Sequence, residues 1–137
     1  MVKRSVRQCI DVLNVVLRRI QKKLLFIPDI DKWQKWDRDI REEIKKVDIA
    51  LLDGTFYDAN ELPGRDMSEI PHPFVKESIQ LFDHLPAIEK RKIAFIHFNH
   101  TNPLLKNNSA EKKLVEKQGM RVATEGAVIP LEPQKQQ

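Results

Sequence analysis

Cysteine is almost absent from this 137-residue sequence, in which Cys9 stands alone. A single cysteine cannot form a disulfide within the chain, and it cannot supply a zinc site built from several cysteines. Low cysteine usage without a disulfide framework is typical of proteins in a reducing compartment. We therefore expect a cytoplasmic location.

Long apolar runs are also absent, because no run approaches the roughly 18–20 residues that a transmembrane helix needs. The basic start MVKRSVR precedes the mostly apolar stretch IDVLNVVL. Asp11 and Asn14 interrupt that stretch, and no small-residue cleavage site follows it. We therefore expect neither a signal peptide nor a membrane partner.

Several well-known catalytic motifs are missing. The sequence contains no GxxxxGK[ST], no G-x-S-x-G and no GxGxxG, so a phosphate-binding loop, a serine hydrolase and a dinucleotide site have no support. Its 4 histidines include neither an HxH nor an HxxxH pair. Any metal site must therefore take its ligands from separate segments.

Charge is plentiful but nearly balanced, with 32% charged residues, 41% hydrophobic residues and a formal net charge of +4. This composition is typical of one soluble globular domain. Basic residues gather before the first predicted strand, at Lys3, Arg4, Arg7, Arg18, Arg19, Lys22 and Lys23. The rest of the chain mixes both signs, so a small nucleic-acid-binding domain is the weaker alternative and nucleic acid is not the expected partner.

The spacing of apolar residues predicts strands that alternate with helices. Residues 2–20 repeat apolar side chains at helical spacing, which predicts a basic amphipathic helix that packs on the domain or, as an alternative, contacts a membrane or nucleic acid. The later segments predict strands at Leu24–Ile27, Val47–Leu52 and Ile93–Ile96, helices at Lys32–Lys46, Val75–Leu85 and Ala110–Gln118, and a final hairpin of Arg121–Ala123 with Ala127–Leu131. This alternation predicts an α/β fold.

Local signals mark the ends of these elements. Pro28 ends the first strand because proline has no N–H to donate. Asp31 is the predicted N-cap of the helix that follows, Ser109 caps the last helix, and Gly119 stops it. The segment Tyr57–Pro71 is rich in proline, glycine, aspartate and asparagine, which predicts a long surface loop of the kind that often carries function.

Four residues at strand ends or in loops are candidates for chemistry: Asp29, Asp53, His72 and His97. Carboxylates and neutral imidazoles suit divalent zinc, manganese or iron, so Asp29 and His97 are candidate metal ligands. Asp53 and His72 are a candidate carboxylate–histidine pair, in which the acid orients the ring and the ring transfers a proton. The structural alternative is that the aspartates cap backbone N–H groups and the histidines satisfy local acceptors.

Five segments also carry a family resemblance: LLFIPDIDKW, VDIALLDGTF, IPHPFVKES, IAFIHFNHTNPLL and GMRVATEGAVIPL. In this order they resemble the C-terminal half of metallo-β-lactamase-fold hydrolases, and most of all the pyrroloquinoline quinone biosynthesis protein B group. The resemblance implies half of an αββα sandwich over residues 23–131, with metal ions at the strand ends. A basic lead-in helix at 1–22 would precede it, and a disordered tail at 132–137 would follow.

The same resemblance implies a role for each candidate residue. Asp29 matches the aspartate that bridges two metal ions, and His97 matches the last ligand histidine. Asp53 lies where related tRNA-processing nucleases have the glutamate of their HEAT-like segment, and His72 matches the histidine that pairs with it as proton donor. The implied activity is metal-dependent hydrolysis of a small-molecule or phosphodiester substrate, with zinc as the implied cofactor and a metal-bound hydroxide as nucleophile.

One departure from the family pattern limits what this chain should do. The HxHxDH signature of the family's N-terminal half is absent, and two protein ligands are fewer than the three or four that zinc usually takes. We therefore expect a truncated half with an incomplete site and little activity alone. It would pair with a missing N-terminal half, or self-associate, through an exposed sheet face. The alternative function is a non-catalytic interaction module, and the fold does not select a substrate.

Overall fold

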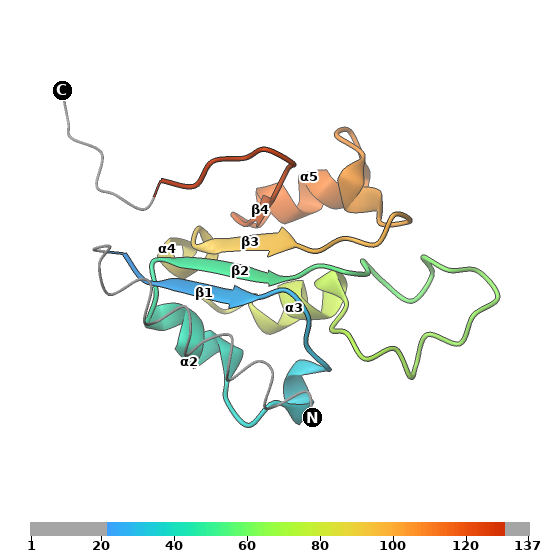
Figure 1. Ribbon diagram of the computed structural model, residues 1–137, viewed down its shortest axis with the longest axis horizontal. Coiled ribbons are helices and arrows are strands. Elements are labelled where there is room, and N and C mark those ends of the chain that lie inside the picture. Colours follow the sequence, from blue (N-terminus) through green and yellow to red (C-terminus); the bar gives the residue numbers. More distant parts are fainter. Residues whose placement is uncertain (1–21, 131–137) are drawn as a thin grey trace.

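A four-stranded, fully parallel sheet organises the protein, whose computed structural model describes residues 22–130 (Figure 1). The strands are β1 (Leu24–Ile27), β2 (Ile49–Asp53), β3 (Ile93–Ile96) and β4 (Arg121–Val122), and they lie in the order β1-β2-β3-β4. The helices are η1 (Trp33–Lys35), α2 (Ile40–Lys45), α3 (Val75–Leu81), α4 (Ala87–Lys90), η2 (Pro103–Leu105) and α5 (Ala110–Lys117). The predicted α/β class is therefore confirmed. The predicted helix at 2–20 and the predicted tail at 132–137 lie outside the described residues.

The register of the sheet brings three turns to one edge. Ile27 pairs with Leu52, Leu52 pairs with Phe95, and Asp53 pairs with Ile96, so β1, β2 and β3 end almost level with one another. All three strands run in the same direction (Figure 1). The segments that follow them must therefore meet at the carboxyl edge of the sheet, where polar groups of α/β proteins commonly gather.

One face of the sheet supplies most of the hydrophobic core. Alternate strand residues pack in a single cluster with residues of α2, α3 and α5: Leu25, Ile27, Ala50, Leu52, Ile93, Phe95, Ile40, Ile44, Val75, Ile79 and Val115. Each fully buried aliphatic side chain contributes roughly 1.5–3 kcal/mol relative to an exposed one. On the opposite face of the sheet, Phe26 and Leu51 are only half-buried. The core therefore holds the sheet in place from one side, and it also holds the ends of the strands.

The predicted helix at 32–46 is wrong as a continuous element. The segment forms the short η1, then extended backbone at Trp36, and only then α2. Its cap is not Asp31 but Asp39, whose side chain accepts a hydrogen bond from the Arg41 N–H. The buried Trp33 side chain donates its indole N–H to Ser78 Oγ at 2.8 Å, so a tertiary contact holds η1 in place, and the backbone becomes extended at Trp36.

The predicted terminal hairpin is also wrong. Arg121 and Val122 form the two-residue β4, which pairs in parallel with Ala94 and Phe95 of β3, and residues 127–130 form no strand. The chain reaches the sheet through α5, and such a crossover returns it in the same direction as the preceding strand. A parallel edge strand therefore replaces the antiparallel pair.

The remaining elements follow their local signals. Ser109 caps α5 through its hydroxyl, and Gly119 follows it with a positive φ of 86°, the left-handed conformation that ends many helices. The helix predicted at 75–85 ends earlier, at Leu81, and α4 follows it. The long loop at 57–71 is present without helix or strand. Within residues 22–130, no helix combines the length and apolar character that crossing a membrane requires.

Candidate functional site

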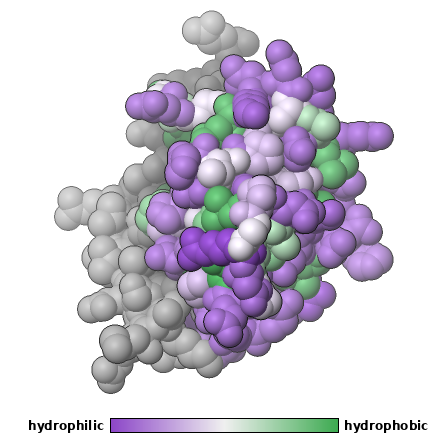
Figure 2. All heavy atoms as spheres, turned by 90° about the vertical axis from the view of Figure 1, so that its right-hand side faces the viewer, coloured by the Kyte–Doolittle hydropathy of each residue, from purple (hydrophilic) through white to green (hydrophobic). Residues whose placement is uncertain are grey.

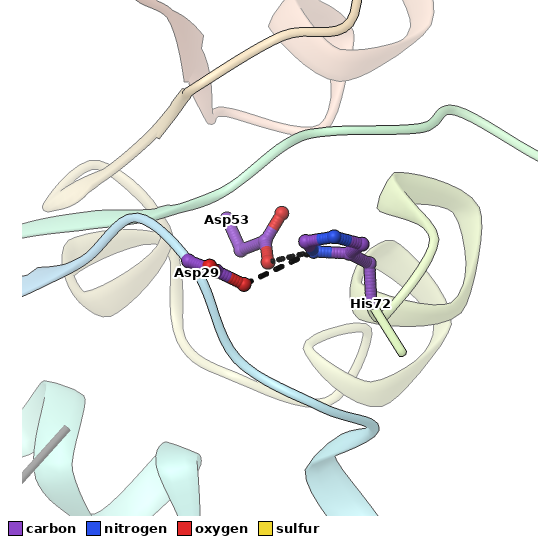
Figure 3. A group of neighbouring side chains, drawn as sticks. All are labelled: Asp29, Asp53 and His72. Carbon is purple, nitrogen blue, oxygen red and sulfur yellow. Dashed lines mark hydrogen bonds and ion pairs between the residues drawn. The ribbon is translucent and has the colours of Figure 1, made fainter. Parts of the chain in front are cut away.

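Polar side chains meet where β1, β2 and β3 end. Figure 2 looks onto this edge of the sheet, and the visible surface is mostly hydrophilic with small hydrophobic patches between. Asp29 follows β1, Asp53 ends β2 and His97 follows β3, while His72 comes from the segment that leads into α3. Figure 3 shows Asp29, Asp53 and His72 turned toward one another.

Asp53 is the fully buried centre of this cluster. One carboxylate oxygen, Oδ1, accepts hydrogen bonds from the Thr55 N–H at 2.9 Å and the Thr55 hydroxyl at 2.7 Å. The other oxygen, Oδ2, accepts from the Ile30 N–H at 3.1 Å and lies 2.8 Å from His72 Nδ1. A buried carboxylate is tolerated only when such donors replace water. Asp53 therefore joins the turn after β1, the turn after β2 and His72.

The Asp53–Gly54–Thr55 turn fits only because residue 54 has no side chain. A Cβ on Gly54 would lie 2.8 Å from the Phe98 ring, 2.9 Å from the Ile96 carbonyl oxygen and 3.1 Å from Phe95 Cβ. The Gly54 N–H donates to that same carbonyl at 2.7 Å. Close approach of β2 and β3 therefore requires glycine here, and it brings Thr55 next to the turn that follows β3.

His72 is held in place by Asp53 and by the segment that follows β2. The N–H groups at the start of α3 donate to the Phe56 and Tyr57 carbonyls, which anchors the segment carrying His72 beside the β2 turn. The Phe56 ring meets the imidazole edge-on, with centroids 6.1 Å apart. The hydrogen bond with Asp53 raises the pKa of His72 above its usual 6.5, against the opposing effect of burial. The ring therefore retains a proton to higher pH than a free histidine.

Asp29 differs from Asp53 in having few partners. Its side chain is 68% exposed, and its Oδ1 lies 3.6 Å from His72 Nδ1. The backbone of the same turn is held because the Ile30 N–H is bonded to Asp53. The structure therefore presents Asp29 as an accessible carboxylate on an anchored turn.

Within residues 22–130, His97 is connected to the cluster through the Thr55 hydroxyl. Its Nδ1 lies 3.2 Å from the Thr55 hydroxyl oxygen, and its side chain is exposed. Asp29, Asp53 and His72 offer ligand atoms within 4.8 Å of one another, but His97 is not part of that group. The structure thus brings three of the four predicted residues into direct contact distance and connects the fourth indirectly.

Two residues of this site were missed from the sequence. Thr55 touches Asp53, His72 and His97 with a single hydroxyl. Asn102 is buried, and its amide donates to the Gly54 and Thr55 carbonyls at 2.7 and 3.2 Å. The only sequence signals were their places in DGT and in HFNHTNP, next to candidates already chosen. Thr55 lies 17 residues from His72 and 42 from His97, and Asn102 lies 47 and 48 residues from its partners, beyond the reach of a spacing argument.

The residues at this edge fit a partial divalent-metal site. Both oxygens of Asp53 are already occupied by donors, so it is a poor ligand despite its place in the cluster. Asp29 has an exposed carboxylate with one long contact to His72, and the exposed His97 ring faces Thr55 through Nδ1, so its Nε2 lies on the far side of the ring. Carboxylate oxygen and imidazole nitrogen are ligands that zinc accepts. Asp29 and His97 are therefore suitable zinc ligands, but they are fewer than the three or four protein ligands that zinc usually has.

The comparisons of this chain with known proteins agree with one another. Residues 3–98 match the Beta-lactamase superfamily domain, and this match begins inside the segment predicted as a lead-in. Coenzyme PQQ synthesis protein B from Klebsiella pneumoniae strain 342 is 31% identical over 128 residues, which cover 88% of this chain and 40% of that protein. The protein of the same name from Cupriavidus necator is 32% identical over 127 residues, with 87% and 40% covered.

A solved structure shares the fold. The crystal structure of Zn(2+)-bound PqqB from Methylobacterium extorquens matches with a TM-score of 0.58 and 23% identity, over 80% of this chain and 40% of that one. The chain thus spans about 40% of the length of the curated relatives it matches. The domain match over most of the chain, with the shared fold, shows that this chain belongs to the beta-lactamase superfamily.

Proposed function

We propose that this chain is the C-terminal half of a metal-dependent hydrolase, in which His72 is the proton donor and Asp53 orients it. The observation that carries the proposal is the 2.8 Å contact between His72 Nδ1 and the fully buried Asp53 carboxylate. A carboxylate–histidine pair of this kind fixes the ring and its tautomer. With Nδ1–H committed to Asp53, Nε2 is the atom that gives a proton to a leaving group.

The raised pKa of His72 supports this role. A general acid must hold its proton at the working pH, and the adjacent Asp53 carboxylate favours the protonated ring. Thr55 and Ile30 hold Asp53 in turn, so the acceptor cannot rotate away from the imidazole. The pair is therefore preorganised before any substrate binds.

Asp29 and His97 are the proposed metal ligands, with zinc as the proposed ion. When bound, such an ion acts as a Lewis acid that activates water and polarises the substrate. Both residues are exposed on turns that Asp53 and Thr55 anchor. Because the 137 residues contain no HxHxDH, we propose weak metal binding and little turnover by this chain alone.

The proposed partner is the other half of the fold, and the proposed substrate is a small molecule or a phosphodiester. The curated relatives are named for coenzyme PQQ synthesis, which makes a cofactor precursor one candidate among the small molecules. A cytoplasmic location also remains a proposal, based on the single cysteine.

Reconstitution tests the proposal. The full chain would be mixed with the N-terminal portion of the Klebsiella pneumoniae relative, and zinc affinity and hydrolysis of bis(p-nitrophenyl) phosphate would be measured for each part and for the mixture. We expect zinc-dependent turnover only in the mixture. His72→Ala should lower that turnover by about 10²–10⁴-fold, while His84→Ala, a change at an exposed histidine outside the site, should not.

Three results would count against the proposal. Stoichiometric, tight zinc binding with turnover by the chain alone would show that the site is complete within it. Full turnover by the His72→Ala mixture would remove the proton donor. A mixture that associates but never gains zinc or activity would favour the alternative, a non-catalytic interaction module.

A further inference from the structure

The Thr55 hydroxyl lies at a junction of three functional groups. Its oxygen is 2.7 Å from Asp53 Oδ1, 3.2 Å from His97 Nδ1 and 3.3 Å from His72 Nδ1. Thr55 itself is buried, with 8% of its surface exposed. Water is thus largely kept from this hydroxyl, and its contacts must be satisfied within the protein.

The number of protons on each group determines which group donates in each of these contacts. A hydroxyl carries one proton and two acceptor lone pairs, and an ionised carboxylate can only accept. The shortest contact therefore commits the Thr55 proton to Asp53. Towards His97, the same oxygen can then act only as an acceptor, so His97 Nδ1 must be the donor.

We propose that Thr55 is a positioning residue that holds His97 in its Nδ1–H tautomer and so leaves Nε2 as the ring's free lone pair. This inference rests on the proposed role of His97 as a metal ligand, because a neutral imidazole binds a metal through the nitrogen that carries no proton. Partners on the other ring nitrogen usually fix a ligand histidine in this way. Thr55 thereby links the proton-donor pair to the metal-ligand residue.

The backbone conformation at His97 also supports a positioning role for Thr55. His97 has a φ of 62°, and within residues 22–130 it is the only non-glycine residue with a positive φ. Such a conformation is unfavourable and persists only where the surroundings determine it. The Thr55 carbonyl accepts the Asn99 N–H at 2.9 Å and is also bonded by the Asn102 amide. Both ends of Thr55, carbonyl and hydroxyl, therefore hold the turn that carries His97.

Nitrogen-15 NMR of the full, metal-free chain tests the proposal directly. Long-range proton–nitrogen spectra of a histidine-labelled sample at alkaline pH distinguish the two neutral tautomers. We expect His97 in the Nδ1–H form in the unmodified chain and in Thr55→Ser, which keeps the hydroxyl. Thr55→Val has nearly the same shape without a hydroxyl, and it should lose this preference. Thr124→Val makes the same change at an exposed site and should leave the spectrum of His97 unchanged.

Zinc titration supplies the second readout. Thr55→Val should weaken zinc binding by roughly 10–100-fold, the usual effect of removing a partner of a ligand histidine, and Thr55→Ser should restore it. An unmodified chain with His97 in the Nε2–H form would overturn the inference, even if Thr55→Val failed to fold. So would a tautomer that Thr55→Val does not change. A chain with the expected tautomers but no zinc affinity would instead contradict the proposed metal role and leave the positioning by Thr55 standing.

Discussion

Two aspartates follow neighbouring parallel strands of the same sheet, yet their surroundings are opposite. Asp53, at the end of β2, is fully buried and each of its oxygens has two hydrogen-bonding partners. Asp29, just after β1, has a side chain that is 68% exposed and a nearest partner at 3.6 Å. The difference arises from the turns: Gly54 lets β2 pass close to β3, whereas Pro28 and Asp29 lie at the edge of the sheet.

The two carboxylates therefore suit different roles: Asp53 stabilises the fold, whereas Asp29 is accessible to a ligand. A carboxylate with every lone pair occupied holds its neighbours in place but has little capacity left for a metal ion. An exposed carboxylate on an anchored turn contributes little to folding but remains free to bind. The two positions should therefore respond in opposite ways to the same substitution, which the following changes test.

Asp53→Ala should have the largest effect. It leaves two buried backbone N–H groups, those of Ile30 and Thr55, without an acceptor, and it removes the partner of His72. We expect the free energy of unfolding to fall by about 3–5 kcal/mol. Urea denaturation measures this loss. Asp29→Ala is the matched control and should stay within about 0.5 kcal/mol of the parent chain. Equal losses at the two positions would contradict the comparison.

Gly54→Ala tests why the β2 turn can be buried at all. The added Cβ meets backbone and ring atoms at 2.8–2.9 Å, so β2 and β3 must separate, and we expect a loss of about 1–3 kcal/mol. Thermal unfolding of the chain measures it. Gly64→Ala offers a contrast, because residue 64 has open space but a φ of 80°, and backbone strain alone should cost roughly 1 kcal/mol. A neutral Gly54→Ala would mean that the close approach is not required.

Asp29→Asn should weaken metal binding and leave the free energy of unfolding unchanged, the opposite of what is expected for changes at Asp53. Removing the charge of a direct ligand should weaken zinc binding at least about tenfold, or roughly 1.4 kcal/mol. Isothermal titration of the full chain with zinc measures the affinity. Asp31→Asn is the control in the same turn, because Asp31 is already engaged with Lys32 and Lys35. If both changes weakened binding equally, general charge and not ligation would explain the result.

The pH dependence of the metal-free chain should show the smallest effect. Because Asp53 raises the pKa of His72 in the folded state, their interaction stabilises the fold fully below the ordinary value of 6.5. That contribution is lost as the pH rises through the raised pKa of His72. Proton NMR titration, with a chelator present, should place the His72 midpoint above 6.5.

Asp53→Asn removes the first cause of the raised pKa and should lower that midpoint, as far as the variant stays folded. Asp29→Asn removes only a minor cause and should lower it much less. An unshifted His72 midpoint in Asp53→Asn would show that the 2.8 Å contact has no electrostatic effect in solution.

Local sequence signals predicted the elements that depend on local chemistry. The strands Leu24–Ile27 and Ile93–Ile96 have the predicted bounds, because each is a short apolar run closed by a turn. Ser109 caps α5 as predicted, since a cap bonds a backbone N–H three residues away. Failures occurred where distant partners competed. Trp33 bonds Ser78, 45 residues away, and the helix breaks nearby, while β4 follows the direction that the crossover imposes.

The sequence by itself determined the α/β class, the strand-end positions of Asp29 and Asp53, and the identity of the four candidate residues. Only the tertiary structure decided which aspartate is buried and that Thr55 connects the predicted pair of Asp53 and His72 to His97. The physical reason is separation along the chain. Caps and turns form between residues a few positions apart, whereas the contacts between the separate segments of this site join residues 17 to 48 positions apart, which only the parallel sheet brings to one edge.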